Sequence, residues 1–275
     1  MQIILLCILI FFENTFGNLM QFGSQTSESI VLKPAFSSSL LAQFPNLVQA
    51  AFGRQGGVSP APYDSLNTAY ATKDAEENVT ANRQLICESL EIPFDSLFPP
   101  NLTPGKEGEV LFVDKAALDS LNATPRRLRP EVHGLVTNTP GINFFMSTAD
   151  CAVITLFDPR HNALGMVHGG FQAVDAHTIG RTIGLMSQKF GTRPSELVAT
   201  LSPSLRTCCN IKPAEKVLQR NSPNWMGYIR SLEDGKLAVN FRGALVRQLI
   251  DHGIEAIDDS APCNGCDRAT YFSNS

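Results

Sequence analysis

The centre of the chain reads Cys151-Ala-Val-Ile-Thr-Leu-Phe157, then Asp158-Pro-Arg-His161, then Ala163-Leu-Gly-Met-Val-His168, and this stretch decides the fold. The first segment is short, apolar and rich in β-branched side chains, which is typical of a buried strand. Asp and Pro in the second segment favour a tight turn. The third segment is apolar again, so the stretch predicts an antiparallel β-hairpin.

The hairpin predicts that Cys151 and His168 lie side by side. If the four turn residues 158–161 are looped out, residue 157 pairs with 162 and residue 151 pairs with 168. Directly opposed residues of antiparallel strands share a face, with Cβ atoms about 4.5–5.5 Å apart. A one-residue slip would put the two side chains on opposite faces, so the prediction depends on the length of the turn.

Such a pair has three possible uses. The thiolate and the imidazole can hold a metal ion, or they can act as nucleophile and base, or they can be a buried thiol and a hydrogen-bonded core histidine. Cysteine catalysis ordinarily needs a third group that orients the histidine. Strand alternation points the neighbouring Asp150 to the opposite face from Cys151, so Asp150 is not an obvious third group. The residue types alone do not choose between these uses.

Two glycines, Gly169 and Gly170, follow His168 and precede a helix that is predicted to start at Asp175. The apolar residues of this helix recur with helical spacing, and Gly191 marks its end. A glycine-rich turn beside a helix N-terminus offers backbone N–H groups and a positive dipole, which suit an anion such as phosphate. The sequence therefore predicts an anion site next to the Cys/His pair.

The segments around this pair resemble the core signature of the laccase-domain family. Its members were first called multicopper polyphenol oxidases and are now regarded as zinc-dependent purine nucleoside phosphorylases. The matching segments run in the family's order from about Phe44 to Ser273, which is nearly the whole chain. They are Phe52-Gly-Arg-Gln-Gly-Gly-Val-Ser59, Leu66-Asn67, Asp74, Val79-Thr-Ala-Asn-Arg83, Leu135-Val-Thr-Asn-Thr-Pro140, Thr148-Ala-Asp-Cys-Ala-Val153, Asp158-Pro159, Val167-His-Gly-Gly-Phe171, Pro203, Cys208-Cys209, Cys263 and Tyr271-Phe-Ser273.

The resemblance implies an enzyme that cleaves adenosine, inosine or methylthioadenosine with phosphate and that also deaminates adenosine at a zinc site. Its expected partners are these small molecules. Zinc is the expected cofactor, because one Cys/His pair falls far short of a multicopper ligand set. Cys151 and His168 match two of the family's three zinc ligands. Arg54 and Arg83 match family arginines and can hold phosphate or substrate, although Arg83 can equally be a helix-surface charge.

The sequence departs from the family at three places. The family's first zinc-binding His has no counterpart in Pro104–Val110, where Lys106 takes its place, and lysine is a poor zinc ligand at neutral pH. The family's His-Ala-Gly-Trp-Arg-Gly reads His168-Gly-Gly-Phe-Gln-Ala173, and the chain stops before the family's paired arginines. Two alternatives therefore stay open: a catalytically dead member that acts as an interaction or regulatory module, and a cysteine hydrolase that uses Cys151 and His168.

His133 complicates the missing ligand. It stands two residues before Leu135, at a position where the family tends to carry an acidic residue. It either replaces the missing zinc ligand or is an exposed loop histidine. The predicted metal-ligand set is Cys151, His168 and His133.

Composition adds few constraints. The chain has 275 residues, 43% of them hydrophobic, and a net charge of −4. This length buries a substantial core, and the charge gives no support for nucleic-acid binding. The basic run Arg126-Arg127-Leu-Arg129 is interpreted as a solvated loop. Cys263-Asn-Gly-Cys266 is half a zinc knuckle, a redox pair or two ordinary cysteines; without a second pair at knuckle spacing, ordinary cysteines are the preferred interpretation.

The N-terminus is apolar from Ile3 to Phe12, too short to span a membrane but long enough for the core of a signal peptide. Residues 1–17 are therefore a possible signal-like leader, residues 18–43 an N-terminal extension, and residues 44–275 the laccase-like domain. The resemblance implies a cytoplasmic protein without a membrane span, and secretion through a leader at Met1–Gly17 is the alternative.

The local patterns predict an α+β fold, and the resemblance implies two packed mixed β-sheets flanked by helices. Strands are expected at Val110–Val113, Phe144–Thr148, Cys151–Phe157, Ala163–His168, Val198–Leu201 and Leu237–Asn240. Helices are expected at Ala75–Leu90, Asp175–Phe190, Pro213–Gln219 and Arg242–His252.

Overall fold

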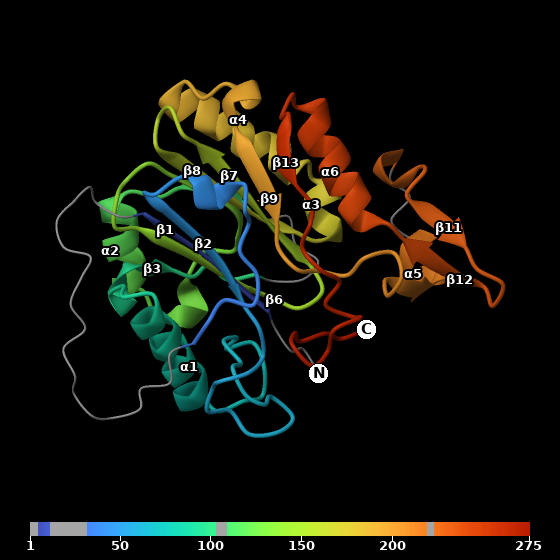
Figure 1. Ribbon diagram of the computed structural model, residues 1–275, viewed down its shortest axis with the longest axis horizontal. Helices are drawn as coiled ribbons and strands as arrows, with labels where there is room; N and C mark the ends of the chain where they lie inside the picture. The colour runs from blue at the N-terminus through green and yellow to red at the C-terminus, as the bar shows by residue number, and fades with distance from the viewer. Residues whose placement is uncertain (1–4, 12–31, 103–108, 219–222) are drawn as a thin grey trace.

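The structure is a computed structural model that describes residues 5–11, 32–102, 109–218 and 223–275 (Figure 1). The strands are β1 (Leu5–Phe11), β2 (Leu47–Phe52), β3 (Leu97–Phe98), β4 (Glu109–Phe112), β5 (Val132–Thr137), β6 (Asn143–Thr148), β7 (Ala152–Asp158), β8 (Ala163–Gly169), β9 (Val198–Leu201), β10 (Ile211–Pro213), β11 (Ile229–Ser231), β12 (Lys236–Val239) and β13 (Ala256–Asp258). The helices are α1 (Glu76–Ser89), α2 (Lys115–Ala123), α3 (Phe171–Asp175), α4 (Thr178–Phe190), α5 (Ala214–Leu218) and α6 (Phe241–Asp251).

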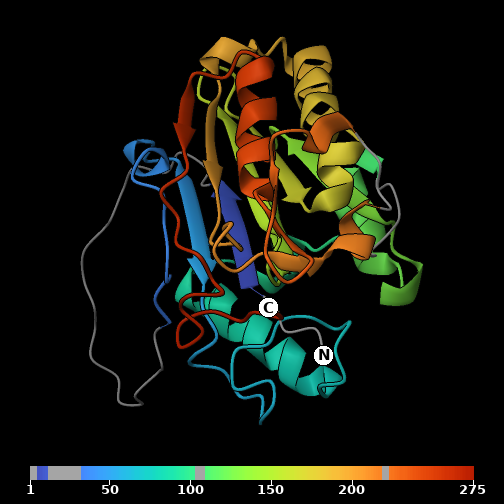
Figure 2. The ribbon, with the colours of Figure 1, turned by 90° about the vertical axis from the view of Figure 1, so that its right-hand side faces the viewer.

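The predicted hairpin, β7 and β8, lies at the centre of a six-stranded mixed sheet with the order β13-β9-β7-β8-β5-β4. Helices α3, α4 and α6 cover the face of this sheet that is turned away from β1 and β2 (Figure 2). Residues on that face, such as Ile154 and Val167, pack with Ile179 of α4 and Leu245 of α6 in one hydrophobic cluster. The predicted α+β fold with two packed mixed sheets is confirmed.

The opposite face of the central sheet packs on a second sheet with the order β2-β1-β6-β3. Val153 and Met166 from the hairpin form one cluster with Phe144 and Met146 of β6, so apolar side chains from both sheets fill the space between them. Helix α1 covers the outer face of the second sheet, where its Ile86 clusters with Phe52, Phe145 and their neighbours.

Strand β1 occupies the middle of this second sheet, between β2 and β6. It pairs antiparallel with both neighbours, with Leu6 opposite Phe52 on one side and Leu5 opposite Thr148 on the other. The segment with the hydropathy of a signal-peptide core is therefore a sheet strand in this structure. Residues 12–31, which include the predicted leader boundary at Gly17, lie outside the described residues.

Every strand and helix predicted from local pattern is present, and with one exception the ends differ from prediction by at most one residue. The exception is the helix predicted at Asp175–Phe190, treated below, and the predicted helix end Gln219 lies outside the described residues. The elements that were not predicted are β1, β2, β3, β5, β10, β11, β13 and α2. None of the helices in the described ranges has the length and hydropathy that crossing a bilayer requires.

Asp158, the last residue of β7, holds the hairpin turn together from inside the fold. Its buried carboxylate accepts hydrogen bonds from the backbone N–H of Arg160 at 2.9 Å and of His161 at 3.1 Å. The Thr192 hydroxyl donates at 2.6 Å and His161 Nδ1 lies at 2.8 Å. Burial acts to raise the pKa of Asp158, but the hydrogen bonds from Thr192 and His161 outweigh it and lower the pKa.

Replacing Asp158 by alanine is expected to lower the free energy of unfolding by about 2–3 kcal/mol, because the donors around it lose their partner in a buried site. Urea denaturation measures the change. Asp234, an exposed aspartate that bonds to Lys236 in the β11–β12 turn, is the control, and its replacement should leave the free energy of unfolding nearly unchanged. Equal losses at the two positions would contradict the prediction.

Candidate functional site

The hairpin brings Cys151 and His168 to one face of the sheet, with a register that differs from the predicted one. Val153 rather than Cys151 stands opposite His168, and Asp158 pairs with Ala163. The turn has the predicted length but begins one residue later, since the Asp158 carboxylate closes the turn while its backbone stays in the ladder. The predicted pairing of 151 with 168 is wrong by two residues, and a shift of two preserves the face, so Cys151 and His168 are diagonal neighbours.

Gly170 lies where the Cys151 and His168 side chains meet. A Cβ atom at Gly170 would be 3.2 Å from Cys151 Sγ and 3.3 Å from His168 Cε1, and one at Gly169 would be 2.4 Å from Ile154 Cδ1. A side chain at position 169 would therefore displace the core, and one at position 170 would crowd the Cys/His pair. Close packing explains both glycines without a ligand.

Strand β5 adds a second imidazole to this pair. His133 lies one position beyond the Gly134↔Val167 pair and faces His168. The two rings are perpendicular, with centroids 5.2 Å apart, and His133 is only 2% exposed. The interpretation of His133 as an exposed loop histidine is therefore wrong. Lys106, which takes the place of the family's first zinc-binding His, lies outside the described residues.

His133 is buried and His168 is half-buried, and both rings are held in the charge state that favours metal binding. Burial lowers the pKa of His133, and burial together with the nearby His133 lowers the pKa of His168 to about 3. The rings are therefore neutral at physiological pH, which is the state that ligates a metal. Within the described part of the chain, His133 Nε2 and His168 Nδ1 are buried without a hydrogen-bond partner. A buried polar atom without a partner costs free energy, and a bound ligand would recover it.

These residues fit zinc by their chemistry. Two neutral imidazoles and one thiol are donor types that zinc prefers, whereas a multicopper centre needs a larger set. Their candidate ligand atoms lie farther apart than the sulfurs of a four-cysteine group described below. The three side chains would therefore have to move closer to bind one ion. His133, Cys151 and His168 would hold such an ion.

Asp150 does not serve as the third member of a catalytic triad. It adopts a positive φ of 77° just before β7, and its carboxylate faces the C-terminal segment. There it accepts hydrogen bonds from the Ser273 hydroxyl at 2.7 Å and from the Asn274 backbone N–H at 3.0 Å. Since His168 Nδ1 also lacks a partner among the described residues, the geometry favours metal binding over a cysteine–histidine nucleophile.

The helix after the two glycines differs from prediction. Helix α3 follows Gly170 and ends at Asp175, and α4 begins only at Thr178. His177, with a φ of 50°, separates the two helices. Asp175 accepts a hydrogen bond from Trp225 Nε1 at 2.7 Å instead of capping a long helix. The predicted start of a long helix at Asp175 is wrong, and α3, with five residues, is too short to provide the expected N-terminal dipole.

Arg83 lies in a pocket with a volume of roughly 180 Å³ on the outer side of β6. Its guanidinium stacks on the rings of Tyr70 and Phe145, 4.5 and 4.6 Å from their centroids, and its Nε donates to the Thr68 carbonyl at 2.8 Å. Arg83 is only 8% exposed, so the helix-surface alternative is wrong.

The pocket carries excess positive charge. Burial lowers the pKa of Arg83 to about 10, which leaves it charged at neutral pH, and Arg126 and Arg129 also line the pocket. Arg126 pairs with Glu76, but within the described ranges neither Arg83 nor Arg129 has a carboxylate partner. Such a group of guanidinium ions suits a phosphate. The run interpreted as a solvated loop therefore supplies two pocket cations.

The pocket opens beside the strand that carries His133. Asn101 lines the pocket and forms an isolated parallel β-bridge with Glu131, which lies two residues before His133. Arg54, by contrast, lies in a separate pocket, where it pairs with Asp64 at 3.2 Å. It also donates to the Arg268 carbonyl, and its guanidinium lies over the Phe272 ring. Through these contacts Arg54 binds the C-terminal segment to the rest of the fold.

Comparisons with known proteins extend over most of the chain. The family described as multi-copper polyphenol oxidoreductase laccase matches residues 48–275. A protein of Bacteroides thetaiotaomicron named purine nucleoside phosphorylase is 27% identical, over 78% of this chain and 80% of its own length. Purine nucleoside phosphorylase YlmD of Geobacillus stearothermophilus is 25% identical, over 84% of this chain and 85% of its own length.

Two solved structures share the fold. The crystal structure of the Bacillus licheniformis hypothetical protein YfiH superposes with a TM-score of 0.73 at 22% identity, covering 82% of this chain and 86% of that one. YlmD from Geobacillus stearothermophilus gives a TM-score of 0.71 at 23% identity, covering 80% of this chain and 83% of that one.

Proposed function

Because the chain belongs to the family described as multi-copper polyphenol oxidoreductase laccase, we propose that it cleaves purine nucleosides with phosphate as the second substrate. The observation that carries the proposal is the group of a buried His133 and a half-buried Cys151 and His168, in which one buried ring nitrogen of each histidine lacks a partner among the described residues. Relatives 25–27% identical carry the name purine nucleoside phosphorylase, which supports the choice of reaction.

In this reaction the bond between the ribose C1′ and the purine nitrogen breaks, a bond forms between C1′ and a phosphate oxygen, and the departing purine takes up a proton. We assign phosphate binding to Arg83 and Arg129, whose charges have no carboxylate partner among the described residues. Guanidinium groups fixed by stacking bind an anion without reorganising, which favours catalysis. In this proposal Arg54 stabilises the fold and does not bind phosphate.

Zinc held by His133, Cys151 and His168 would supply a Lewis acid. We further propose a second reaction at this same site, in which a water molecule adds at C6 of adenine and the amino group leaves as ammonia, so that adenosine becomes inosine. Adenosine, inosine and methylthioadenosine are the candidate substrates. Gly170 keeps space open beside the proposed metal ligands, because a side chain there would reach the Cys151 sulfur and the His168 ring, whereas Gly169 accommodates the core residue Ile154.

The test is to incubate the purified protein with zinc, each nucleoside and phosphate, and to separate the products by chromatography. We expect free base and ribose 1-phosphate, with no base released when phosphate is omitted. Inosine formed from adenosine would report deamination. Base release that is independent of phosphate would identify a hydrolase instead. If no product forms with any nucleoside, the chain is a catalytically inactive member of the family and the proposal fails.

Replacing Arg83 by glutamine tests the phosphate pocket. We expect the KM for phosphate to rise roughly tenfold to a hundredfold, because the variant loses one or two charge-assisted hydrogen bonds to phosphate. The KM for the nucleoside should change little. Arg127→Gln is the matched control, because Arg127 is an exposed cation from the same run as Arg126 and Arg129 and does not line the pocket. Equal rises in both KM values would argue for a structural role of Arg83.

A further inference from the structure

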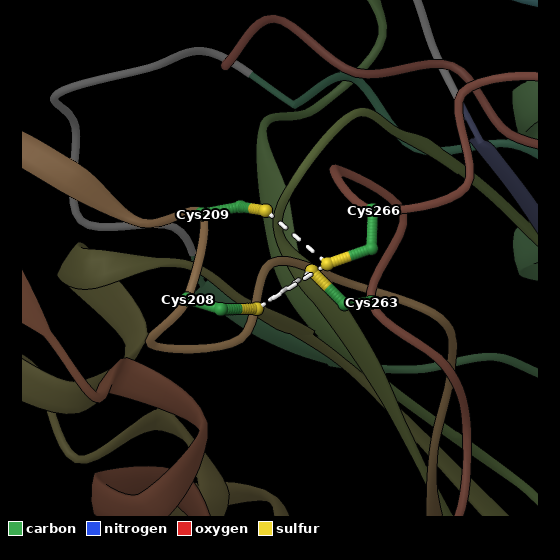
Figure 3. A group of neighbouring side chains, drawn as sticks. All are labelled: Cys208, Cys209, Cys263 and Cys266. Atoms are coloured by element: carbon green, nitrogen blue, oxygen red, sulfur yellow. Dashed lines mark hydrogen bonds between the residues drawn. The ribbon is translucent and has the colours of Figure 1, made fainter.

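Four cysteines from two distant segments meet beside the C-terminal end of the chain (Figure 3). Cys208 and Cys209 follow β9, and Cys263 and Cys266 follow β13. Their four sulfur atoms all lie within 4.8 Å of one another. Figure 3 shows the four side chains pointing toward a common centre from both segments. This group is separate from His133, Cys151 and His168.

The spacing of the sulfurs is that of a metal tetrathiolate. A zinc ion with four sulfur ligands at about 2.3 Å in a tetrahedron sets neighbouring sulfurs about 3.8 Å apart. The Cys208 Sγ lies 3.7 Å from Cys263 Sγ and 3.4 Å from Cys266 Sγ, and the Cys209 Sγ lies 3.4 Å from Cys266 Sγ. A disulfide would require about 2.05 Å between two sulfurs, and all four cysteines are free thiols with sulfurs well beyond that distance.

Backbone contacts around the sulfurs bring the two cysteine segments close together. The Arg206 N–H points at the Cys263 sulfur at 3.4 Å, a hydrogen bond that stabilises a thiolate. The Cys266 and Asp267 N–H groups both donate to the Cys263 carbonyl, which folds Cys263-Asn-Gly-Cys266 into a tight turn. A Cβ atom at Gly265 would lie 2.7 Å from Cys209 Cβ, so glycine lets the two segments come together.

We propose that Cys208, Cys209, Cys263 and Cys266 bind one zinc ion as a structural site. Cys208 and Cys266 are exposed, so an ion can enter, and Cys263 is buried, so it anchors the ion to the fold. Four soft thiolates and a closed coordination sphere are typical of structural rather than catalytic zinc.

The ion would fasten the C-terminal segment to the rest of the molecule. Asn264, which lies between the two ligands Cys263 and Cys266, donates to the Asp150 carboxylate at 3.3 Å and to the Phe272 carbonyl at 3.1 Å. Ser273 also donates to Asp150. Asp150 precedes Cys151, so the structural zinc would brace the backbone next to the proposed catalytic metal site.

The test is to count zinc in the full chain purified with a reductant and without chelator. The background is the double variant Cys151→Ser/His168→Leu, so that the other proposed site contributes nothing. We expect about one zinc per chain in this background, lost on adding Cys263→Ser and kept on adding Cys87→Ser. Cys87 is a buried cysteine of α1 and serves as the matched control. Because the count is made without the other site, its outcome is independent of the proposed enzyme activity.

Cobalt replacement keeps the test decisive if Cys263→Ser fails to fold. The same double variant loaded with Co²⁺ should show strong visible d–d bands and the thiolate-to-cobalt charge transfer of four sulfur ligands. Absence of both zinc and this spectrum would overturn the proposal. A disulfide among the four cysteines, found by mass spectrometry of protein kept in reductant, would overturn it as well.

Discussion

Replacing His168 or His133 by leucine is expected to reduce phosphorolysis on the order of a hundredfold or more without lowering the stability of the metal-free protein. In most cores the loss of a buried polar side chain is destabilising because its partners are left unpaired. Here His133 Nε2 and His168 Nδ1 have no partner among the described residues, so leucine removes an uncompensated polar atom. The structure therefore predicts that function and stability separate at these two positions.

The measurement combines activity with thermal unfolding in the presence and absence of zinc. Wild type should gain stability on adding zinc, and the His168→Leu and His133→Leu variants should gain less from the site they have lost. His252→Leu is the control, because His252 is an exposed histidine at the end of α6. Full activity in His133→Leu would show that His133 is not a ligand, and loss of stability without zinc in both variants would point to a structural role.

Deleting residues 1–11 is expected to prevent the chain from forming a soluble, folded protein. Strand β1 pairs with β2 from Leu6 to Phe11 and with β6 from Leu5 to Leu9, so both neighbours depend on it. Its removal would leave two strands with unpaired backbone groups in the middle of a sheet, an arrangement that aggregates. A cleaved signal peptide would give the opposite result, because the mature protein folds without its leader.

Soluble yield, circular dichroism and size-exclusion chromatography after expression in a cytosolic host give the answer. A point variant refines it: Ile8→Pro removes a backbone N–H from a central strand and should be nearly as damaging as the deletion. Ile8→Val, which keeps the N–H and a β-branched side chain, should behave as wild type. An unchanged unfolding midpoint after deletion would contradict a structural β1 and favour the secretory alternative.

The sequence by itself determined the hairpin and the face it presents. Two short apolar runs around the Asp-Pro turn identify β7 and β8, which are buried along almost their whole length, and Cys151 and His168 share one face as predicted. The sequence did not determine the register. The Asp158 carboxylate can close the turn whether or not the Asp158 backbone pairs with the opposite strand. Thr192, which is distant in sequence, donates a hydrogen bond to the same carboxylate, and the hairpin segment alone does not reveal this contact.

For His133 and for the basic run at Arg126, the local sequence does not show which residues surround them in the fold. His133 was a candidate from its position alone, but only the pairing of β5 with β8 buries it against His168. The basic run at Arg126 looks solvated because nothing nearby in sequence shows that Tyr70 and Arg83 lie beside it.

Only the tertiary structure assembled the four cysteines. An adjacent pair and a Cys-x-x-Cys turn are each uninformative, since neither has the spacing of a complete zinc motif. The parallel pairing of β13 with β9, continued by the Ser204↔Cys263 bridge, sets the two segments side by side. Ligands separated by more than fifty residues are joined by strand order, and strand order is a property of the packed sheet rather than of any local stretch of sequence.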